Sequence, residues 1–382
     1  MQCGHFEAGR CRSCALMGTP YDAQLAEKQR QVAATLPTGL AWLPPVASRE
    51  SGFRNKAKLV AAGTRGAPVL GILDRDQHGI DLTNCGLYEP GLAEAVRTMP
   101  RLVAELGLTP YDVPRRTGEL KHVLLTHSPD DELMLRFVLR SPGQLRRIRD
   151  GLALLREELS GLRVVSANLQ PEHKAIIEGD EEHVLTPEDS LPMRVNDVTL
   201  HLRTRSFFQT NTAVAAALYA QARAWIADLR PSEVWDLYCG VGGFALHALG
   251  HGADRVVGVE SSAEAVASAR LSGAALARGH HEWHAGDATR MLDDPVLTGR
   301  SGPDLVVVNP PRRGIGAALC ARLDEHGPRH VLYSSCNVTT LAADLAAMPR
   351  LRPIAARLFD MFPQTGHHEV MVLLERDPPA QA

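Results

Sequence analysis

The chain has no long apolar run, no strong charge imbalance and no paired set of cysteines, and each absence narrows its function. No stretch of the 382 residues approaches the roughly 20 consecutive apolar residues that a membrane-spanning helix needs. The first residues, MQCGHFEAGRCRSC, also lack the apolar region of a secretory signal, so we expect a cytoplasmic protein without a membrane partner. Seven cysteines, an odd number, argue against a secreted disulfide framework and leave metal binding, catalysis or burial as their roles.

The formal net charge of −3 does not by itself indicate a nucleic-acid-binding protein. Basic residues are nevertheless grouped locally, and such groups can follow a phosphate backbone, although most are only solvated surface. The groups are Arg54/Lys56/Lys58, Arg115/Arg116/Lys121, Arg146/Arg147/Arg149 and Arg312/Arg313.

Composition and length predict folded domains, since 45% of the residues are apolar and 382 residues exceed the usual size of one core. Residues 1–40 join a cysteine-rich start to a polar helical stretch at 21–36 and predict a tethered extension. Residues 41–195 contain short β-rich runs and two helical stretches, which predicts a small α+β domain without a catalytic motif. Residues 196–382 alternate apolar strands with Ala-rich helices. This pattern predicts an α/β doubly wound parallel sheet with its ligand crevice at the strand C-termini.

A glycine-rich turn in this last segment indicates a nucleotide-type cofactor. Asp236-Leu-Tyr-Cys-Gly-Val-Gly-Gly follows a predicted strand and opens a helix, and Glu260, which ends the next strand, can accept hydrogen bonds from ribose hydroxyls. NAD remains an alternative, although the turn lacks the G-x-G-x-x-G spacing and resembles the S-adenosylmethionine loop of class I methyltransferases. Asp287 is placed like the acid that such enzymes present to adenine, although an aspartate there is often only a helix cap.

A candidate nucleophile ends the strand that follows the Asn309-Pro-Pro-Arg312 segment. The two prolines make a rigid shelf, and Cys336, in SSCN, lies beside that shelf if the sheet is doubly wound. A cysteine at the end of an apolar strand is usually buried core, but at a ligand crevice its thiolate can attack a substrate.

Such a thiolate suits methylation of carbon 5 of uracil, which is too poor a nucleophile to attack a sulfonium methyl group unaided. Addition at carbon 6 makes an enolate whose carbon 5 takes the methyl group, and a base then removes the remaining hydrogen. Glu369, in FPQTGHHE, is the candidate base, because partial desolvation at a strand margin raises the pKa of a carboxyl group. His367 or His368 is the alternative base, and a solvated edge strand is the alternative setting for Glu369.

The motifs DLYCGVGG, NPPRRG, SSCN and FPQTGHHE, with SFFQTN at 206–211, together resemble the RNA 5-methyluridine methyltransferase family over essentially the whole chain. The resemblance implies a class I S-adenosylmethionine methyltransferase fold, with Cys336 as nucleophile and Glu369 as base. It also implies cofactor contacts from Gln209, Tyr238, Gly240, Glu260 and Asn309. The commoner motif has aspartate where this chain has Asn309, which leaves the role of that residue open.

NPPRRG and the early cysteine motif resemble the branch that methylates uracil 747 of 23S ribosomal RNA, so we expect that RNA as partner of a monomeric enzyme whose central domain binds RNA. The target uracil must leave its stack to reach thiolate and cofactor. Phe207 is the candidate for stacking on it, with a core position as the alternative, and Arg54 is the candidate for gripping the neighbouring RNA.

Four cysteines form a candidate metal site: Cys3, Cys11 and Cys14 in C-x₇-C-x₂-C, and Cys85. Their spacing does not choose between zinc and an iron–sulfur cluster, and free thiols are a further alternative. The resemblance favours a [4Fe–4S] cluster, with a structural or RNA-holding role, since methyl transfer to uracil needs no redox step. We expect Cys239 and Cys320 to be buried.

Three other functions remain open from the sequence. The first is a transfer RNA uridine methyltransferase of the same family. The second is an amino-group methyltransferase of the adenine-N6 type, suggested by NPP, which would need neither Cys336 nor Glu369. The third is a non-catalytic iron–sulfur RNA-binding protein.

Overall fold

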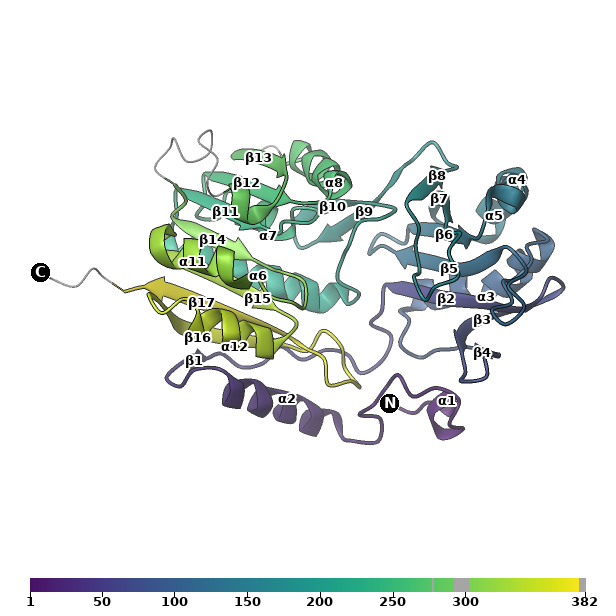
Figure 1. The fold of residues 1–382 in the computed structure, drawn as a ribbon, viewed down its shortest axis with the longest axis horizontal. Helices are drawn as coiled ribbons and strands as arrows, with labels where there is room; N and C mark the ends of the chain where they lie inside the picture. Colours follow the sequence, from purple (N-terminus) through teal and green to yellow (C-terminus); the bar gives the residue numbers. More distant parts are fainter. Residues whose placement is uncertain (277, 292–301, 378–382) are drawn as a thin grey trace, which may run out of the picture. The chain divides into compact units, whose positions relative to one another are not determined.

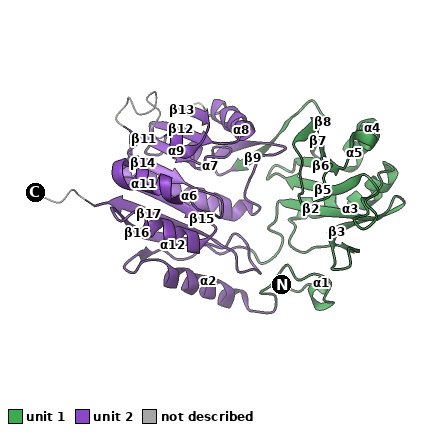
Figure 2. Cartoon of the chain, viewed as in Figure 1, with its two compact units in different colours: residues 1–17, 49–194 green, residues 18–48, 195–382 purple. Residues whose placement is uncertain are grey.

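The computed structural model describes residues 1–276, 278–291 and 302–377, which form two compact units (Figures 1 and 2). The first unit comprises residues 1–17 and 49–194, and the second comprises residues 18–48 and 195–382. This division differs from the predicted segments, because the N-terminal 40 residues are shared between the two units.

The first unit is built on a seven-stranded sheet in the order β4-β3-β2-β5-β6-β7-β8, antiparallel except for the β6–β7 pair. Its strands are β2 (Lys56–Thr64), β3 (Ala67–Leu73), β4 (Gly79–Asp81), β5 (Leu120–His127), β6 (Leu133–Leu139), β7 (Leu162–Leu169) and β8 (Glu181–Val184). Its helices are α1 (Gly4–Glu7), α3 (Pro90–Glu105), η1 (Pro142–Gln144), α4 (Leu145–Asp150) and α5 (Leu152–Glu158).

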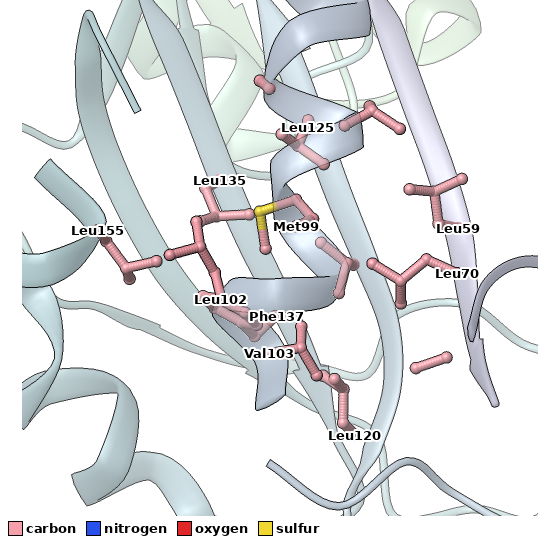
Figure 3. Packing of buried hydrophobic residues seen from close by; sticks show 14 of the residues in the cluster. Leu59, Leu70, Met99, Leu102, Val103, Leu120, Leu125, Leu135, Phe137 and Leu155 are labelled. Carbon is pink, nitrogen blue, oxygen red and sulfur yellow. The ribbon is translucent and has the colours of Figure 1, made fainter. Parts of the chain in front are cut away.

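One face of this sheet carries the core of the first unit. Leu59 and Phe137 from the strands pack with Met99 and Leu102 of α3 and with Leu155 of α5 (Figure 3). Side chains alternate between the faces of a strand, so Lys56, Lys58 and Val60 of β2 lie on the opposite face.

The second unit contains an eight-stranded sheet in the order β1-β16-β17-β15-β14-β11-β12-β13. The run from β15 to β13 is parallel, as the sequence predicts, whereas β17 runs antiparallel between β16 and β15. These strands are β1 (Ala41–Trp42), β11 (Glu233–Leu237), β12 (Arg255–Glu260), β13 (His280–Ala285), β14 (Leu305–Val308), β15 (His330–Ser335), β16 (Leu351–Phe359) and β17 (Glu369–Arg376). Along the chain, β9 (Ser190–Val195) and β10 (Val198–Arg203) precede them.

Helices cover both faces of this sheet, as in a doubly wound fold. The apolar cluster on one face includes residues of α2, α9, α11 and α12, while α7 and α8 contact β11 and β12 from the other. The helices of the unit are α2 (Tyr21–Thr35), α6 (Thr212–Leu229), α7 (Gly243–Ala248), α8 (Ala263–Ala274), α9 (Ala288–Met291), α11 (Gly316–His326) and α12 (Val338–Ala346).

The helix predicted at 21–36 is confirmed as α2, but it is part of the second unit and not of a tethered extension. Val32 and Leu36 join the apolar core of that unit. Lys28 Nζ forms a buried ion pair with Asp360 Oδ1 at 2.6 Å. This contact joins residues more than 300 positions apart, which is why local sequence patterns do not reveal it.

No helix in the described ranges is both long and apolar enough to cross a membrane.

Candidate active site

The glycine-rich turn after β11 adopts a backbone conformation that only glycine takes up readily. Gly240 and Gly242 have φ angles of +53° and +90°, a region that residues with a side chain rarely adopt. A Cβ on Gly242 would also lie 2.8 Å from the Trp283 ring. The turn therefore requires glycine here, and it leads directly into the N-terminus of α7.

Two acidic residues follow the glycine-rich turn along the chain: Glu260, which ends β12, and Asp287, which lies just after β13. The Glu260 carboxylate accepts hydrogen bonds from the Gly240 and Ser262 backbone N–H groups, at 3.3 and 2.9 Å. Asp287 Oδ1 accepts from the Thr289 and Arg290 N–H groups at 3.0 and 3.2 Å, so it does cap α9. These contacts show the helix-capping role of Asp287, and its role in cofactor binding stays a prediction.

Tyr238 belongs to the same region, since burial raises the pKa of its phenol and the nearby Asp287 carboxylate raises it further. The residues predicted to hold the cofactor's adenosine portion are thus gathered at one edge of the parallel strands.

Asp236, the first residue of the turn motif, has a role that the sequence did not reveal. Its side chain is fully buried, and its Oδ2 accepts a hydrogen bond from the Ala245 N–H of α7 at 3.0 Å. Burial raises its pKa to about 7, and the Glu260 charge adds to that shift. Asp236 therefore fastens the start of α7 to the end of β11.

Cys336 and Glu369 lie at the same end of two paired strands. In the antiparallel pair of β15 and β17, Ser335 is opposite Val370; Cys336 follows the first and Glu369 precedes the second. The two ionisable groups are close enough for the Glu369 carboxylate to raise the pKa of the Cys336 thiol, after the larger effect of burial. The sheet therefore brings the predicted nucleophile and the predicted base together.

Glu369 is deeply buried, with 2% of its surface exposed. Ser334 Oγ donates a hydrogen bond to its Oε1 at 2.7 Å, and burial raises the pKa of its carboxyl group to about 7 despite that bond. The alternative of a solvated edge strand is wrong, because β17 lies between β16 and β15. A carboxyl group that titrates near neutral pH suits a general base.

Arg312 is the cation beside the thiol. Its guanidinium lowers the pKa of Cys336, against burial and Glu369. Its backbone carbonyl accepts hydrogen bonds from Asn337 Nδ2 at 2.9 Å and Thr340 Oγ1 at 3.1 Å, which ties the NPPRRG segment to the SSCN segment. The half-buried Asn309 opens the same segment directly after β14, the neighbour of β15.

Asp344 of α12 stabilises the loop that follows the NPPRRG segment, and no sequence motif marks this residue. Its Oδ2 accepts hydrogen bonds from the Ile315 N–H at 2.9 Å and from the Tyr333 hydroxyl at 2.6 Å. A Cβ on Gly314, which has a φ of +79°, would stand 2.4 Å from the same oxygen. Gly314 is therefore the residue that lets the loop close onto Asp344.

The loop before Glu369 is held by α2. Lys28 Nζ donates to the Phe362 carbonyl at 3.1 Å in addition to its ion pair with Asp360, and Gln24 accepts from the Gln364 N–H at 3.1 Å. His367 is exposed at the tip of this loop, whereas Glu369 is buried at its end. Burial lowers the pKa of His367, and the charges of Arg312 and Lys28 lower it further.

In the SFFQTN segment one aromatic side chain is exposed, while the next aromatic side chain and the glutamine are buried. Phe207 is 71% exposed, so the core alternative for this residue is wrong, while Phe208 and Gln209 are buried. Asn211 caps α6 by accepting from the Val214 N–H at 3.3 Å and donates to Ser48 at 2.8 Å.

The four cysteines predicted to bind a metal lie in the first unit, as does Arg54. Burial raises the pKa of Cys14 to about 11, and the nearby thiols of Cys85, Cys11 and Cys3 raise it further, while the Arg54 charge opposes the shift. Cys14 packs with Phe53 and Leu87 in an apolar cluster that Cys85 borders. Cys239 and Cys320 are buried, as predicted.

Four thiols gathered beside an apolar cluster are a donor set that fits either zinc or an iron–sulfur cluster.

Several known RNA methyltransferases are similar to this chain. A family profile described as tRNA (Uracil-5-)-methyltransferase matches residues 293–377, a range that includes both Cys336 and Glu369. A 23S rRNA (uracil(747)-C(5))-methyltransferase RlmC of Halothiobacillus neapolitanus is 48% identical over 379 residues, covering 98% of this chain and 100% of that protein. A protein of the same name from Yersinia pseudotuberculosis is 47% identical over 378 residues, covering 98% and 99%.

Among solved structures, a Pyrococcus abyssi tRNA (uracil-54, C5)-methyltransferase in complex with S-adenosyl-L-homocysteine superposes with a TM-score of 0.79 at 23% identity. The match covers 94% of this chain and 85% of that one. At this identity the likeness concerns the fold, and it agrees with the predicted class I methyltransferase architecture.

Proposed function

The chain belongs to the RNA uracil-5-methyltransferase family. From that premise we propose that it methylates carbon 5 of uracil 747 in 23S ribosomal RNA, with S-adenosylmethionine as the methyl donor. The observation that carries the proposal is the pairing of Cys336 with the buried Glu369 at one end of β15 and β17. An amino-group methyltransferase needs neither residue, and a non-catalytic RNA-binding protein needs no nucleophile and base brought together at one end of a sheet.

The proposed reaction assigns one step to each group. The Cys336 thiolate adds to carbon 6 of the uracil, and carbon 5 of the resulting enolate takes the methyl group from the sulfonium. The Glu369 carboxylate removes the proton from carbon 5, and the carbon–sulfur bond breaks to return the thiolate. Arg312 favours the thiolate at the start and end of this cycle, because its charge lowers the pKa of Cys336.

The cofactor is proposed to bind across the turn after β11. In this proposal Glu260 accepts hydrogen bonds from the ribose hydroxyls and Asp287 accepts from the adenine amine. Tyr238, Gly240, Gln209 and Asn309 are proposed as further contacts. An amide at Asn309 can accept a hydrogen bond through its oxygen but carries no charge, so it would orient the cofactor or the uracil without attracting the sulfonium charge.

The target RNA can be tested directly. Ribosomal RNA from a strain that lacks this gene should carry unmodified uracil at position 747, and the purified enzyme should restore 5-methyluridine there, as mapped by mass spectrometry. Transfer RNA from the same strain is the matched control. Methylation of the transfer RNA and not of the 23S RNA would assign the chain to the transfer RNA branch.

We also propose that Cys3, Cys11, Cys14 and Cys85 hold a [4Fe–4S] cluster. The support is their convergence beside an apolar cluster and Arg54, together with the family resemblance of the early cysteine motif. Protein purified without oxygen should be brown, because thiolate–iron charge transfer absorbs in the visible region. Stoichiometric zinc without iron in elemental analysis would overturn the proposal.

The exposed Phe207 is proposed to stack on the target uracil or on the base beside it. Phe207→Ala should leave the melting temperature unchanged, because little of the side chain is buried, and should lower methyl transfer to RNA. Phe208→Ala, which removes the buried neighbour, is the structural control. Wild-type turnover in Phe207→Ala would remove the stacking role.

A further inference from the structure

A cavity of about 330 Å³ opens within the first unit and is lined by none of the residues assigned above to methyl transfer or to the cysteine site. Its volume is at the lower end of the range of about 300 to 1,000 Å³ that is usual for small-molecule pockets. Part of its wall is apolar, from Val60, Leu73, Val113 and Ile177. The polar part of the lining includes Gln77, Tyr111, Lys121, His122, His173 and Lys174.

The polar side of the cavity is organised around Tyr111. Its hydroxyl lies 3.0 Å from His173 Nδ1, and the two rings are tilted with centroids 6.2 Å apart. The Lys121 ammonium lies 5.0 Å from the centre of the Tyr111 ring, a cation–π geometry. His173 is exposed, whereas Tyr111 and Lys121 are buried. The cavity thus has one exposed ring, His173, beside a buried one, Tyr111.

Lys121 is a buried cation with only neutral oxygen partners. It donates to Gln170 Oε1 and to the Glu172 carbonyl, and within the described part of the chain no carboxylate lies within ion-pairing distance of its Nζ. Burial lowers its pKa. The lining residue Lys174 pairs with the exposed Glu172 carboxylate at 2.5 Å. The Glu172 carboxylate raises the pKa of Lys121 from a distance but pairs directly with Lys174, so an anionic group in the cavity would give Lys121 a direct counter-charge.

A basic path leads away from the cavity along β2. Val60 pairs with His122 of β5, and both line the cavity. Lys58 and Lys56 continue on the same face of β2, opposite the apolar core. Burial and the neighbouring Lys121 charge lower the pKa of His122 to about 4, so its neutral ring can hydrogen-bond to the edge of a base at neutral pH. This face therefore joins a ring-sized pocket to two lysines, Lys58 and Lys56, of which Lys58 lies 3.9 Å from the Glu178 carboxylate.

We propose that this cavity binds one unpaired nucleotide of the RNA substrate, other than the target uracil. Its base stacks on His173 and Tyr111 against the apolar wall, and its phosphate lies near Lys121 and Lys174. The inference rests on the proposed RNA substrate and adds a second contact by which that RNA is recognised. It also explains why the basic residues of β2 and β5 are grouped in a chain with little net charge.

The test is a scan of abasic substitutions in the full-length protein. A 23S RNA hairpin that carries the target uracil is prepared with one base removed at each other unpaired position in turn, and dissociation constants are measured by fluorescence anisotropy. Wild-type protein should lose affinity about tenfold at one of these positions, since alanine scans of stacking aromatics give losses of this order. His173→Ala should bind the intact RNA about tenfold more weakly and lose nothing further at that position.

His78→Ala is the matched control, because it removes an exposed histidine of the same unit that does not line the cavity. Lys174→Ala, paired with Arg156→Ala on α5, gives a second measurement that does not depend on the ring. The slope of log Kd against log salt concentration should fall by roughly one in Lys174→Ala and stay unchanged in Arg156→Ala.

Equal abasic profiles for wild type, His173→Ala and His78→Ala, in a wild-type protein that methylates the RNA, would overturn the cavity assignment alone. Failure of the wild-type protein to bind or methylate 23S RNA would overturn the proposed function and this inference with it.

Discussion

Replacing Ser334 by alanine should move the pH at which Glu369 acts as a base. Burial raises the pKa of Glu369 to about 7, and the 2.7 Å hydrogen bond from Ser334 Oγ opposes that shift by stabilising the carboxylate. A hydrogen bond to a charged group contributes about 1.5–3 kcal/mol. One pKa unit corresponds to about 1.4 kcal/mol, so removal of the bond should raise the pKa by about one unit, to about 8.

The consequence is largest at neutral pH. At pH 7 the ionised fraction of Glu369 would fall from about one half to about one tenth, and proton removal from carbon 5 should slow about fivefold, whereas at pH 9 the two proteins should be equal. The assay is the release of tritium from RNA labelled at carbon 5, followed in single turnovers between pH 6 and pH 9. Ser334→Thr, which keeps a hydroxyl group, is the matched control.

Superimposable pH profiles for Ser334→Ala and wild type would refute the reasoning. They would mean either that Ser334 does not stabilise the carboxylate or that Glu369 is not the group that takes the proton. A profile of Ser334→Ala that shifts toward acid would contradict the sign of the argument.

Two further predictions concern stability. Because the folded state raises the pKa of Glu369 from 4.5 to about 7, the stability that this residue provides is complete below about pH 4.5 and is lost as the pH rises through 7. Wild type should therefore lose about 2.5 kcal/mol of unfolding free energy, measured in urea, relative to Glu369→Gln between pH 5 and pH 8. A difference between the two proteins that stays constant with pH would contradict this. Lys28→Met should destabilise the protein by about 3 kcal/mol, since it leaves the buried Asp360 charge unpaired, and Lys28→Met/Asp360→Asn should recover most of that loss. Equal melting temperatures for Lys28→Met and wild type would show that the ion pair does not hold α2.

The chemistry of the site was accessible from sequence because its residues lie in short motifs at strand ends. Cys336 and Asn309 end adjacent parallel strands, and parallel strands place their C-termini at one edge. The glycine turn and Glu260 follow from the same rule, which is why the candidate cofactor residues lie near one another.

The supporting groups were not accessible, because they act through long-range contacts without a motif. Asp344 fastens the NPPRRG segment from α12, and Lys28 reaches the loop before Glu369 from a helix whose sequence is mostly polar. The deep burial of Glu369 depends on the antiparallel insertion of β17 between β15 and β16, which is a property of the whole sheet. The polar stretch GHHE at 366–369, just before the apolar run VMVLL, gives no indication that Glu369 is buried.

The division of labour between Cys336 and Glu369 is the central claim, and trapping of the covalent intermediate tests it most directly. Each variant is incubated with 23S RNA and S-adenosylmethionine and run on a denaturing gel. Glu369→Gln should accumulate a protein–RNA adduct that survives denaturation, because addition and methylation proceed while carbon 5 keeps its proton. Cys336→Ala should bind the cofactor and form no adduct. Release of methylated RNA from Glu369→Gln at the wild-type rate, without an adduct, would contradict the account and leave His367 as the base.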